Sequence, residues 1–223
     1  MKGILAVGDC ITRGVKHCFE NSYPERVGRA LNIPVKNCGR AMCSSKEGIF
    51  MLKDNDSHEF DYVIIQFGLK DAHSTFKYSP NILYYPDNFF RKQARKIVKK
   101  YKKSCKKIGL NNLLGEVCVV PEQVYRNNVS LMVERCKSKL VILPEIIPHQ
   151  EIARNKTIQR YNIILEEIAK THDNCIYIRI FDDFLKKMPE YYLDMGHPNE
   201  FGYSYISGKI LEHLDEVAMR KLT

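Results

Sequence analysis

Residues 2–14 of the chain, KGILAVGDCITRG, run from an apolar segment straight into a polar turn. The apolar segment from Ile4 to Val7 is continuous, which is typical of a strand that is buried on both faces. Such strands belong to parallel sheets that are covered by helices on both sides. Asp9 and Cys10 follow directly, so the sequence predicts that they lie at the carboxyl edge of a sheet, where ligands bind.

Three further apolar segments repeat this pattern along the chain; they are YVIIQFG (62–68), KLVILPEI (139–146) and CIYIRIF (175–181). A weaker one, IPVKN (33–37), lies between the segment from Ile4 to Val7 and YVIIQFG. Other segments have apolar residues three and four positions apart, which predicts helices over 23–32, 157–172 and 202–222. Strands that alternate with helices predict one α/β domain over residues 1–223, with a mostly parallel sheet and helices on both faces.

The composition is that of an ordinary globular protein: of 223 residues, 44% are hydrophobic and 27% are charged. No apolar segment approaches the roughly 20 residues that span a bilayer, and the first is shorter than the roughly 7–15 residues of a signal-peptide core. The 8 cysteines are scattered without a C-x-x-C pair, which indicates reduced thiols and neither a disulfide scaffold nor a zinc site. We therefore expect a cytoplasmic protein without a zinc site.

Candidate catalytic residues follow several of the predicted strands. Cys10 follows the first strand, Gly39 the second and Gly68 the third, while Asp194 and His197 lie three residues apart near the C-terminus. A thiol, an imidazole and a carboxylate are the groups that acyl transfer uses as nucleophile, base and orienting acid. Spacing alone is equally compatible with structural roles, because most buried cysteines and many loop histidines are structural.

Four blocks of sequence, taken together, favour the catalytic interpretation. GDCITRG (8–14), NCGRAMCSS (37–45), VIIQFGLKDA (63–72) and DMGHPNEFGY (194–203) resemble, in order and spacing, the motif blocks of the SGNH (GDSL-like) hydrolase family. The resemblance runs through nearly the whole chain. It implies a three-layer, flavodoxin-like fold whose five-stranded parallel sheet has the order 2-1-3-4-5, with helices on both faces. It implies no metal and no cofactor.

The resemblance also implies a role for each candidate residue. Cys10 takes the place of the nucleophile, and Asp194 and His197 take the places of the acid and the base. The N–H groups of Cys10 and Gly39, together with the side chain of Lys70, are expected to hold the oxyanion. Such a site hydrolyses an ester, and we expect an O-acyl ester of a carbohydrate or of a similar polar molecule.

Two positions depart from the family pattern. Cys10 stands where the family has Ser, and Lys70 stands where it has Asn. The cysteine is compatible with native thiolate chemistry, with a degenerate site or with an engineered replacement. Lys70 either stabilises the oxyanion and lowers the pKa of Cys10, or it points into solvent. Asp9 and Asp71 are expected to support the site by accepting main-chain N–H groups, without taking part in the chemistry.

Residues 72–118 form an insertion where a short connection is expected. Ten of the 17 residues from Arg91 to Lys107 are basic, enough to account for the formal net charge of +9. An apolar stripe with helical spacing runs through this segment; it consists of Phe90, Ala94, Ile97, Tyr101, Cys105 and Ile108. This pattern predicts an amphipathic helix over 89–108 with a cationic outer face. In the adjoining segment TFKYSPNILYYPDN (75–88) we expect substrate contacts.

The cationic helix and the function both have alternatives at this point. The lysines of the helix either only face solvent, or they bind an acidic glycan or an anionic membrane surface. Nucleic acid is not expected as a partner, because the chain has no nucleic-acid-binding motif. The same catalytic site also fits an O-acyltransferase, in which a second alcohol takes the acyl group. A third alternative is a catalytically weak domain that binds an acidic glycan or a membrane surface.

Overall fold

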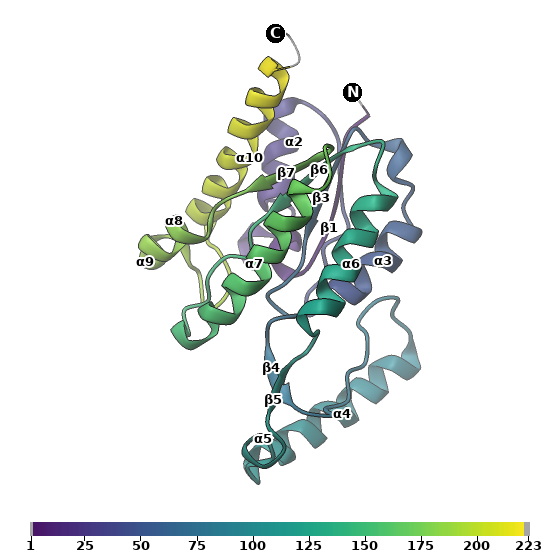
Figure 1. Ribbon diagram of the computed structural model, residues 1–223, viewed down its shortest axis with the longest axis vertical. Coiled ribbons are helices and arrows are strands. Elements are labelled where there is room, and N and C mark those ends of the chain that lie inside the picture. Colours follow the sequence, from purple (N-terminus) through teal and green to yellow (C-terminus); the bar gives the residue numbers. More distant parts are fainter. Residues whose placement is uncertain (1, 221–223) are drawn as a thin grey trace.

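The five predicted apolar segments form one parallel sheet at the centre of the molecule (Figure 1). The computed structural model describes residues 2–220. The strands of the sheet are β1 (Ile4–Gly8), β2 (Val35–Asn37), β3 (Tyr62–Gln66), β6 (Leu140–Pro144) and β7 (Cys175–Ile178). They lie in the order β2-β1-β3-β6-β7, and every neighbouring pair is parallel. The predicted strand order is therefore confirmed.

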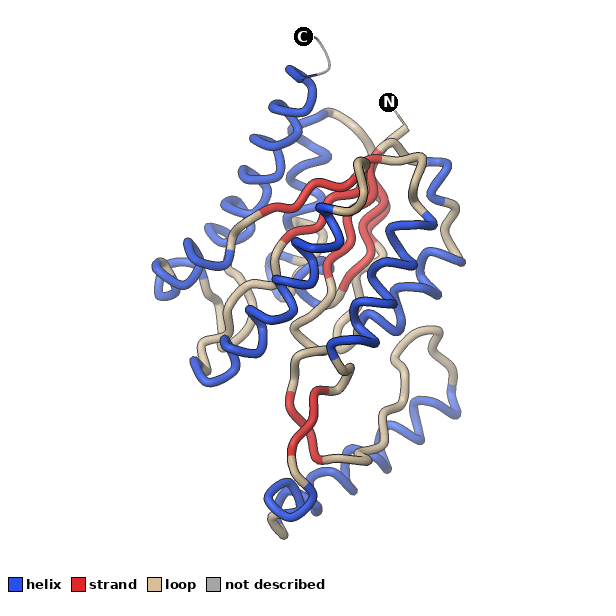
Figure 2. The backbone as a smooth tube through the Cα atoms, viewed as in Figure 1, coloured by secondary structure: helices blue, strands red, loops and turns tan. Residues whose placement is uncertain are grey.

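Long helices cover both faces of this sheet and give the molecule three layers (Figure 2). One face carries α3 (Ser45–Lys53), α6 (Glu122–Arg135) and α7 (Asn155–Lys170), and the other carries α2 (Tyr23–Leu31) and α10 (Glu200–Arg220). Successive side chains of β1 point to opposite faces, so Leu5 packs in the first core and Ile4 in the second; both are fully buried. This explains why the strand is apolar without alternation.

Short helices complete the body, and two helix starts bear directly on the site. The short elements are α1 (Cys10–Arg13), α8 (Phe181–Lys186), α9 (Met188–Tyr191) and the 3-10 turns Lys16–Cys18, Ser57–Glu59 and Ile152–Arg154. Asp9 accepts the Ile11 N–H at 2.9 Å and thereby caps α1. Ser44 and Glu47 form a capping box at the start of α3. Between residues 2 and 220, no helix is both long enough and apolar enough to cross a membrane.

The insertion leaves the layered body as an arm (Figures 1 and 2). Its two ends are β4 (Ser74–Phe76) and β5 (Glu116–Cys118), which pair antiparallel as a separate two-stranded sheet. Between them the chain forms α4 (Phe89–Lys107) and α5 (Leu110–Leu114). The predicted basic helix is therefore present, and Asn88 caps it by accepting the Arg91 N–H at 2.8 Å.

The predicted amphipathic helix has a cationic outer face, which implies that its apolar stripe is buried. In the structure most of this stripe is exposed. Cys105 is buried, but Phe90 is 81% exposed and Ile97 is 69% exposed. The reason is that α4 turns Arg95 inward, where its guanidinium pairs with Asp87 at 2.6 Å and donates to a main-chain carbonyl of the 77–88 segment. These charge-assisted bonds set the rotation of the helix and leave most of its apolar stripe in solvent.

Candidate active site

The candidate catalytic residues meet at the carboxyl edge of the sheet, as the sequence predicts. Cys10 lies just after β1, Lys70 lies after β3, and Asp194 and His197 lie in the loop before α10. All four line one cavity of about 320 Å³. The other lining residues are Asp9, Met42, Cys43, Leu69, His73, His149, Arg154, Met195 and Gly196.

Asp194 and His197 are joined by a short hydrogen bond. The Nδ1 atom of His197 lies 2.7 Å from Oδ1 of Asp194, and the same oxygen accepts the N–H groups of Gly196 and His197 at 3.1 and 3.0 Å. Burial works to raise the pKa of Asp194, but these hydrogen bonds outweigh it and leave the pKa below its usual value. The carboxylate therefore fixes the imidazole with its proton on Nδ1, which leaves Nε2 free to take a proton.

The loop that carries this pair is held in place at both ends. Leu193 donates its N–H to the His197 carbonyl at 2.9 Å, and Tyr192 and Pro198 form an isolated antiparallel bridge. Gln150, from the loop after β6, donates its side-chain amide to the Asp194 carbonyl at 3.1 Å. Asp194 and His197 thus lie in a small closed loop that is tied to the sheet edge.

Cys10 is the first residue of α1, and its thiol faces the cavity in protonated form. Burial raises the pKa of Cys10 far above its usual range, and the nearby carboxylates of Asp9 and Asp194 raise it further. The expectation that a neighbouring cation lowers this pKa is therefore wrong. Within residues 2–220 no hydrogen bond joins the thiol to the ring of His197. The thiol of Cys10 is therefore protonated at neutral pH.

Asp9 itself has an unusual protonation state. Its carboxyl group is buried at the end of β1, and burial raises its pKa to about 7, against the hydrogen bond from the Ile11 N–H. The group is therefore partly protonated at neutral pH. Asp71 is also buried, and burial raises its pKa to about 6 although it accepts the Ser45 N–H at 2.9 Å. Asp71 ties the start of α3 to the loop after β3, in the supporting role expected for it.

Gly39 does not reach this cavity, in contrast to the expectation that its N–H helps to hold the oxyanion. Its N–H donates to Oδ1 of Asn37 at 2.8 Å, and the residue lines a different cleft. Met42, three residues later, lines the catalytic cavity instead, with a left-handed φ of 65°. No acceptor in the described part of the chain lies within hydrogen-bond distance of the Met42 N–H. The sequence around Met42 does not predict this placement, because methionine rarely adopts a left-handed backbone conformation.

Lys70 lines the cavity rather than pointing only into solvent. It is half-buried, and burial lowers its pKa, although Glu47 and Asp71 act in the opposite direction. No carboxylate between residues 2 and 220 lies within ion-pair distance of its ammonium group. Of the two alternatives for Lys70, the geometry favours an electrostatic role in the site.

Three basic side chains complete the wall, and sequence patterns alone assigned none of them to the site. Nη1 of Arg154 lies 3.1 Å from Nδ1 of His73, and Nε of Arg154 pairs with Glu151 at 2.7 Å. Burial, with Lys70 and Arg154 nearby, lowers the pKa of His73 to about 4, so its ring is neutral at pH 7. His149 accepts the Glu151 N–H at Nδ1, and burial lowers its pKa as well. Both histidines can therefore act as neutral hydrogen-bonding groups.

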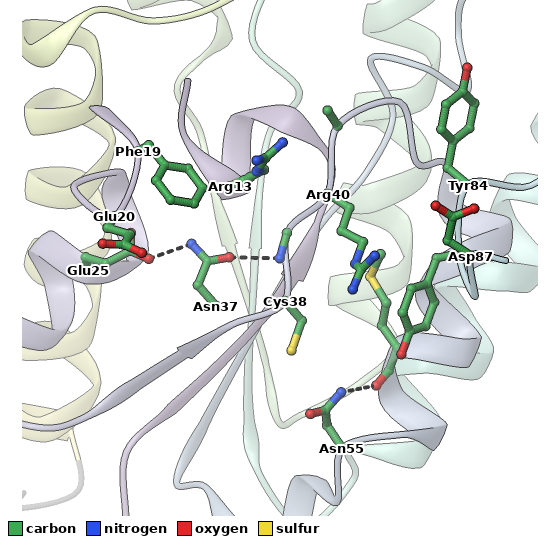
Figure 3. A pocket seen from close by; sticks show the side chains of 14 residues that line it. Arg13, Phe19, Glu20, Glu25, Asn37, Cys38, Arg40, Asn55, Tyr84 and Asp87 are labelled. Atoms are coloured by element: carbon green, nitrogen blue, oxygen red, sulfur yellow. Dashed lines mark hydrogen bonds between the residues drawn. The ribbon is translucent and has the colours of Figure 1, made fainter. Parts of the chain in front are cut away.

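Figure 3 shows a second and larger cleft, of about 650 Å³. It adjoins the catalytic cavity, because Ala41 lines the cleft and the next residue, Met42, lines the cavity. Arg13 of α1 and Arg40, which follows β2, lie on the walls of the cleft, and Tyr84 and Asp87 of the insertion close one side. Tyr85 of the insertion also lines the cleft. The segment 75–88, in which substrate contacts are expected, thus borders this cleft. Across residues 2–220, no three His, Cys, Asp or Glu side chains lie close enough together to bind a metal ion.

The chain matches a known protein family and resembles several solved structures. The model of the GDSL-like lipase/acylhydrolase family matches residues 6–205. A lipase/acylhydrolase from Enterococcus faecalis superposes with a TM-score of 0.68, at 18% identity, over 96% of this chain and 95% of that chain. A lipolytic protein of the G-D-S-L family from Veillonella parvula DSM 2008 gives 0.65, at 17% identity, over 94% and 96%.

A third solved structure is a catalytic mutant of an acetylxylan esterase from Geobacillus stearothermophilus. It superposes with a TM-score of 0.62, at 17% identity, over 94% of this chain and 92% of that chain. No curated protein sequence matches the chain. At these identities the solved structures bear on the fold, and the family rests on the match over residues 6–205.

Proposed function

The chain belongs to the GDSL-like lipase/acylhydrolase family and is an ester-bond hydrolase, and we propose that it cleaves O-acyl esters of carbohydrates with Cys10 as its nucleophile. The single observation that carries this proposal is the cavity that Cys10 shares with the hydrogen-bonded pair of Asp194 and His197. Nucleophile, base and orienting acid are the three groups that the reaction needs.

The first half of the reaction transfers the acyl group to sulfur. Nε2 of His197 takes the Sγ proton as Sγ attacks the ester carbonyl carbon, so that the thiolate exists only in contact with the substrate. Asp194 stabilises the imidazolium that forms. When the tetrahedral intermediate collapses, the C–O bond breaks, His197 returns the proton to the leaving alcohol, and a thioester remains on Cys10.

The second half releases the acid. His197 takes a proton from a water molecule, whose oxygen attacks the thioester carbon. The C–S bond then breaks, the acid leaves, and the proton passes from His197 to the sulfur of Cys10. Negative charge develops on the carbonyl oxygen in both halves, and the free N–H of Met42 and the ammonium group of Lys70 are suited to stabilise it.

Hydrolysis of p-nitrophenyl acetate tests the proposal. We expect the wild type to turn it over and His197→Ala to lose about 10³-fold or more in kcat/KM. His58→Ala, which removes an exposed imidazole before the amino end of β3, is the matched control and should leave the rate unchanged. Trapped enzyme should carry an acyl group on Cys10 in a peptide map. Equal rates in the wild type and His197→Ala would rule out the proposed base.

Acyl transfer to a second alcohol is the alternative use of the same site, favoured by the large polar cleft beside it. The two outcomes share the thioester and differ in what resolves it. Adding methanol or glycerol to the p-nitrophenyl acetate assay separates them: a transferase releases p-nitrophenol faster and forms the new ester, whereas a hydrolase forms acetate at an unchanged rate. Cys10→Ser tests whether the site is built for sulfur. If the cysteine is a replacement in a serine site, the serine variant should be more active than the wild type.

A further inference from the structure

The second cleft is a separate cavity that lies next to the catalytic one. Among residues 2–220, none lines both cavities. Cys10 and Arg13 belong to the same short helix, yet Cys10 lines the catalytic cavity and Arg13 the cleft. In the loop after β2, residues up to Ala41 line the cleft, and Met42 and Cys43 line the catalytic cavity. A molecule bound in the cleft would therefore lie close to Cys10.

Planar groups and unpaired charges face each other across this cleft. In Figure 3, Arg13, Phe19 and Glu20 lie on one side and Arg40 on the other. The Arg13 guanidinium lies 5.0 Å from the centre of the Phe19 ring, and that of Arg40 lies 4.7 Å from the centre of the Tyr85 ring. Between residues 2 and 220, no carboxylate lies within ion-pair distance of either arginine. Stacking holds each guanidinium in place while its N–H donors stay free.

Acceptors balance these donors. Glu20, Glu25 and Asp87 also line the cleft, and Asn37 bridges Glu25 to the loop after β2 by donating to Oε1 of Glu25 at 2.7 Å (Figure 3). The lining therefore carries charges of both signs, although one of its carboxylates, Asp87, is already paired with Arg95. An anion would meet the carboxylates and a cation would meet the arginines, whereas a neutral polyol can donate to the first and accept from the second.

We propose that this cleft binds the alcohol part of the ester as a neutral sugar, next to the catalytic cavity that takes the acyl group. The inference rests on the proposed function and names the substrate class on the leaving-group side. Sugar hydroxyls satisfy the arginines and carboxylates, and a C–H face of the ring packs against Tyr84 or Phe19, which is 47% exposed. Three of the lining residues come from the insertion, so this arm contributes to sugar recognition.

Steady-state kinetics with two substrates tests the cleft. We expect Arg13→Ala/Arg40→Ala to lower the ratio of kcat/KM for O-acetylated xylo-oligosaccharides to kcat/KM for p-nitrophenyl acetate at least tenfold, mainly through a higher KM for the oligosaccharide. Arg135→Ala is the matched control, because Arg135 is exposed at the far end of α6. An unchanged ratio in the double variant would overturn the proposal.

Direct binding separates a failure of the cleft from a failure of the catalytic proposal. Unacylated xylohexaose is titrated into Cys10→Ala protein with and without the two arginine changes. Binding that depends on the arginines supports the cleft even if p-nitrophenyl acetate is not hydrolysed. Absence of xylohexaose binding, or binding only of oligogalacturonate, overturns the neutral-sugar assignment even if p-nitrophenyl acetate is hydrolysed in a His197-dependent way.

The arm carries a second, independent observation in the outer surface of α4. Phe90, Ile97 and Tyr101 are exposed along one stripe that continues to Ile108, which is 76% exposed, and Leu113 of the neighbouring helix α5 is 80% exposed. We define these five residues as the arm stripe. No acidic residue occurs between Asp87 and Glu116, whereas ten lysines and arginines lie between Arg91 and Lys107. A large apolar surface within a strongly cationic segment is typical of a binding face.

We infer that the arm stripe docks α4 onto an anionic phospholipid surface. Aliphatic side chains such as Ile97 and Ile108 gain by burial among acyl chains, and an acidic glycan offers them nothing comparable. A second copy of the chain would bring two segments of the same high positive charge together. Anionic headgroups instead complement the lysines that flank the stripe, so charge and apolar area favour the same partner.

Co-sedimentation with vesicles tests the docking. We expect binding to phosphatidylcholine vesicles that contain about 30% phosphatidylglycerol, and a loss of at least tenfold in Lys99→Glu/Lys103→Glu/Lys106→Glu and in Ile97→Ser/Ile108→Ser. Lys36→Glu/Lys53→Glu/Lys156→Glu has the same net charge as the first variant, at exposed lysines outside the arm, and should bind better than it. Three outcomes would overturn the inference: wild-type binding that both variants retain, binding of dextran sulfate but not of vesicles, or a concentration-dependent dimer that the isoleucine variant abolishes.

Discussion

Helices α4 and α7 both have an apolar stripe in the sequence, yet they bury it to very different extents. Leu165 of α7 is 1% exposed and packs against the sheet, whereas Ile97 of α4 is 69% exposed. Helical spacing establishes that a stripe exists, and it does not establish what covers it. In the body the sheet covers the stripe. In the arm, ion pairs with the 77–88 segment hold the helix and leave the stripe free for another surface.

The largest expected effect tests this contrast through stability. Leu165→Ala should lower the free energy of unfolding by about 2–5 kcal/mol, because it leaves a cavity in the core. Ile97→Ala removes a similar side chain from an exposed site and should change the free energy of unfolding by less than about 0.5 kcal/mol. Urea denaturation followed by far-UV circular dichroism measures both. A cost above 2 kcal/mol for Ile97→Ala would mean that the stripe is covered by protein in solution.

The next effect compares a buried carboxyl of the body with an exposed one of the arm. The pKa of Asp9 is raised to about 7 from its usual range near 4, so between these values the folded state binds more protons than the unfolded state. Its contribution to stability is therefore full below about pH 4 and is lost as the pH rises to about 7. Asp9→Asn, which can still cap α1, should make the protein more stable than the wild type at pH 8 by about 1–3 kcal/mol.

Asp87 provides the counterpart. Its hydrogen bond and ion pair with Arg95 hold the pKa of Asp87 below the usual value. The pH dependence is therefore opposite to that of Asp9: the contribution of Asp87 to stability is present at neutral pH and is lost as the pH falls. The group is exposed, so Asp87→Asn should leave the pH dependence of the unfolding free energy nearly unchanged. Urea titrations at pH 5, 6, 7 and 8 test the pair. A stability profile for Asp9→Asn that parallels the wild type would contradict the raised pKa of Asp9.

The smallest effect concerns the helix caps. Ser44→Ala breaks the capping box of α3, which is buried, and should cost about 1 kcal/mol of unfolding free energy. Asn88→Ala breaks the cap of α4 and should leave global unfolding unchanged, while the Arg91 amide exchanges its hydrogen faster. Equal global costs would show that the arm unfolds together with the body.

Much of the fold could be predicted from residue patterns alone. Continuous apolar segments such as 62–68 and 139–146 indicate buried parallel strands, since both faces of the sheet are covered. The strand order came from the resemblance of the four blocks. The pairing of Asp194 with His197 was also predictable, because a separation of three residues in a tight loop leaves their side chains close together.

The rest of the site depends on features that patterns do not encode. Met42 reaches the cavity through a left-handed backbone conformation, and Gly39 is drawn away by the side chain of Asn37. Arg154 and His149 come from the long segment after β6, and only the path of that loop brings them to the wall. The pKa of Cys10 is raised because the thiol is buried and lies beside Asp9. The sequence shows which cations are near Cys10 along the chain, but it does not show this burial.

The antiparallel pairing of β4 with β5 has a consequence for how this protein can change over time. Paired strands lie about 4.8 Å apart, so the segment 77–115 leaves and re-enters the body at almost the same point. Chain length can be added to or removed from such a segment at little cost in loop-closure entropy and without moving the catalytic groups. Because Tyr84 and Tyr85 belong to it, natural variation in this one segment can reshape both the second cleft and the exposed face of α4, while the central sheet stays unchanged.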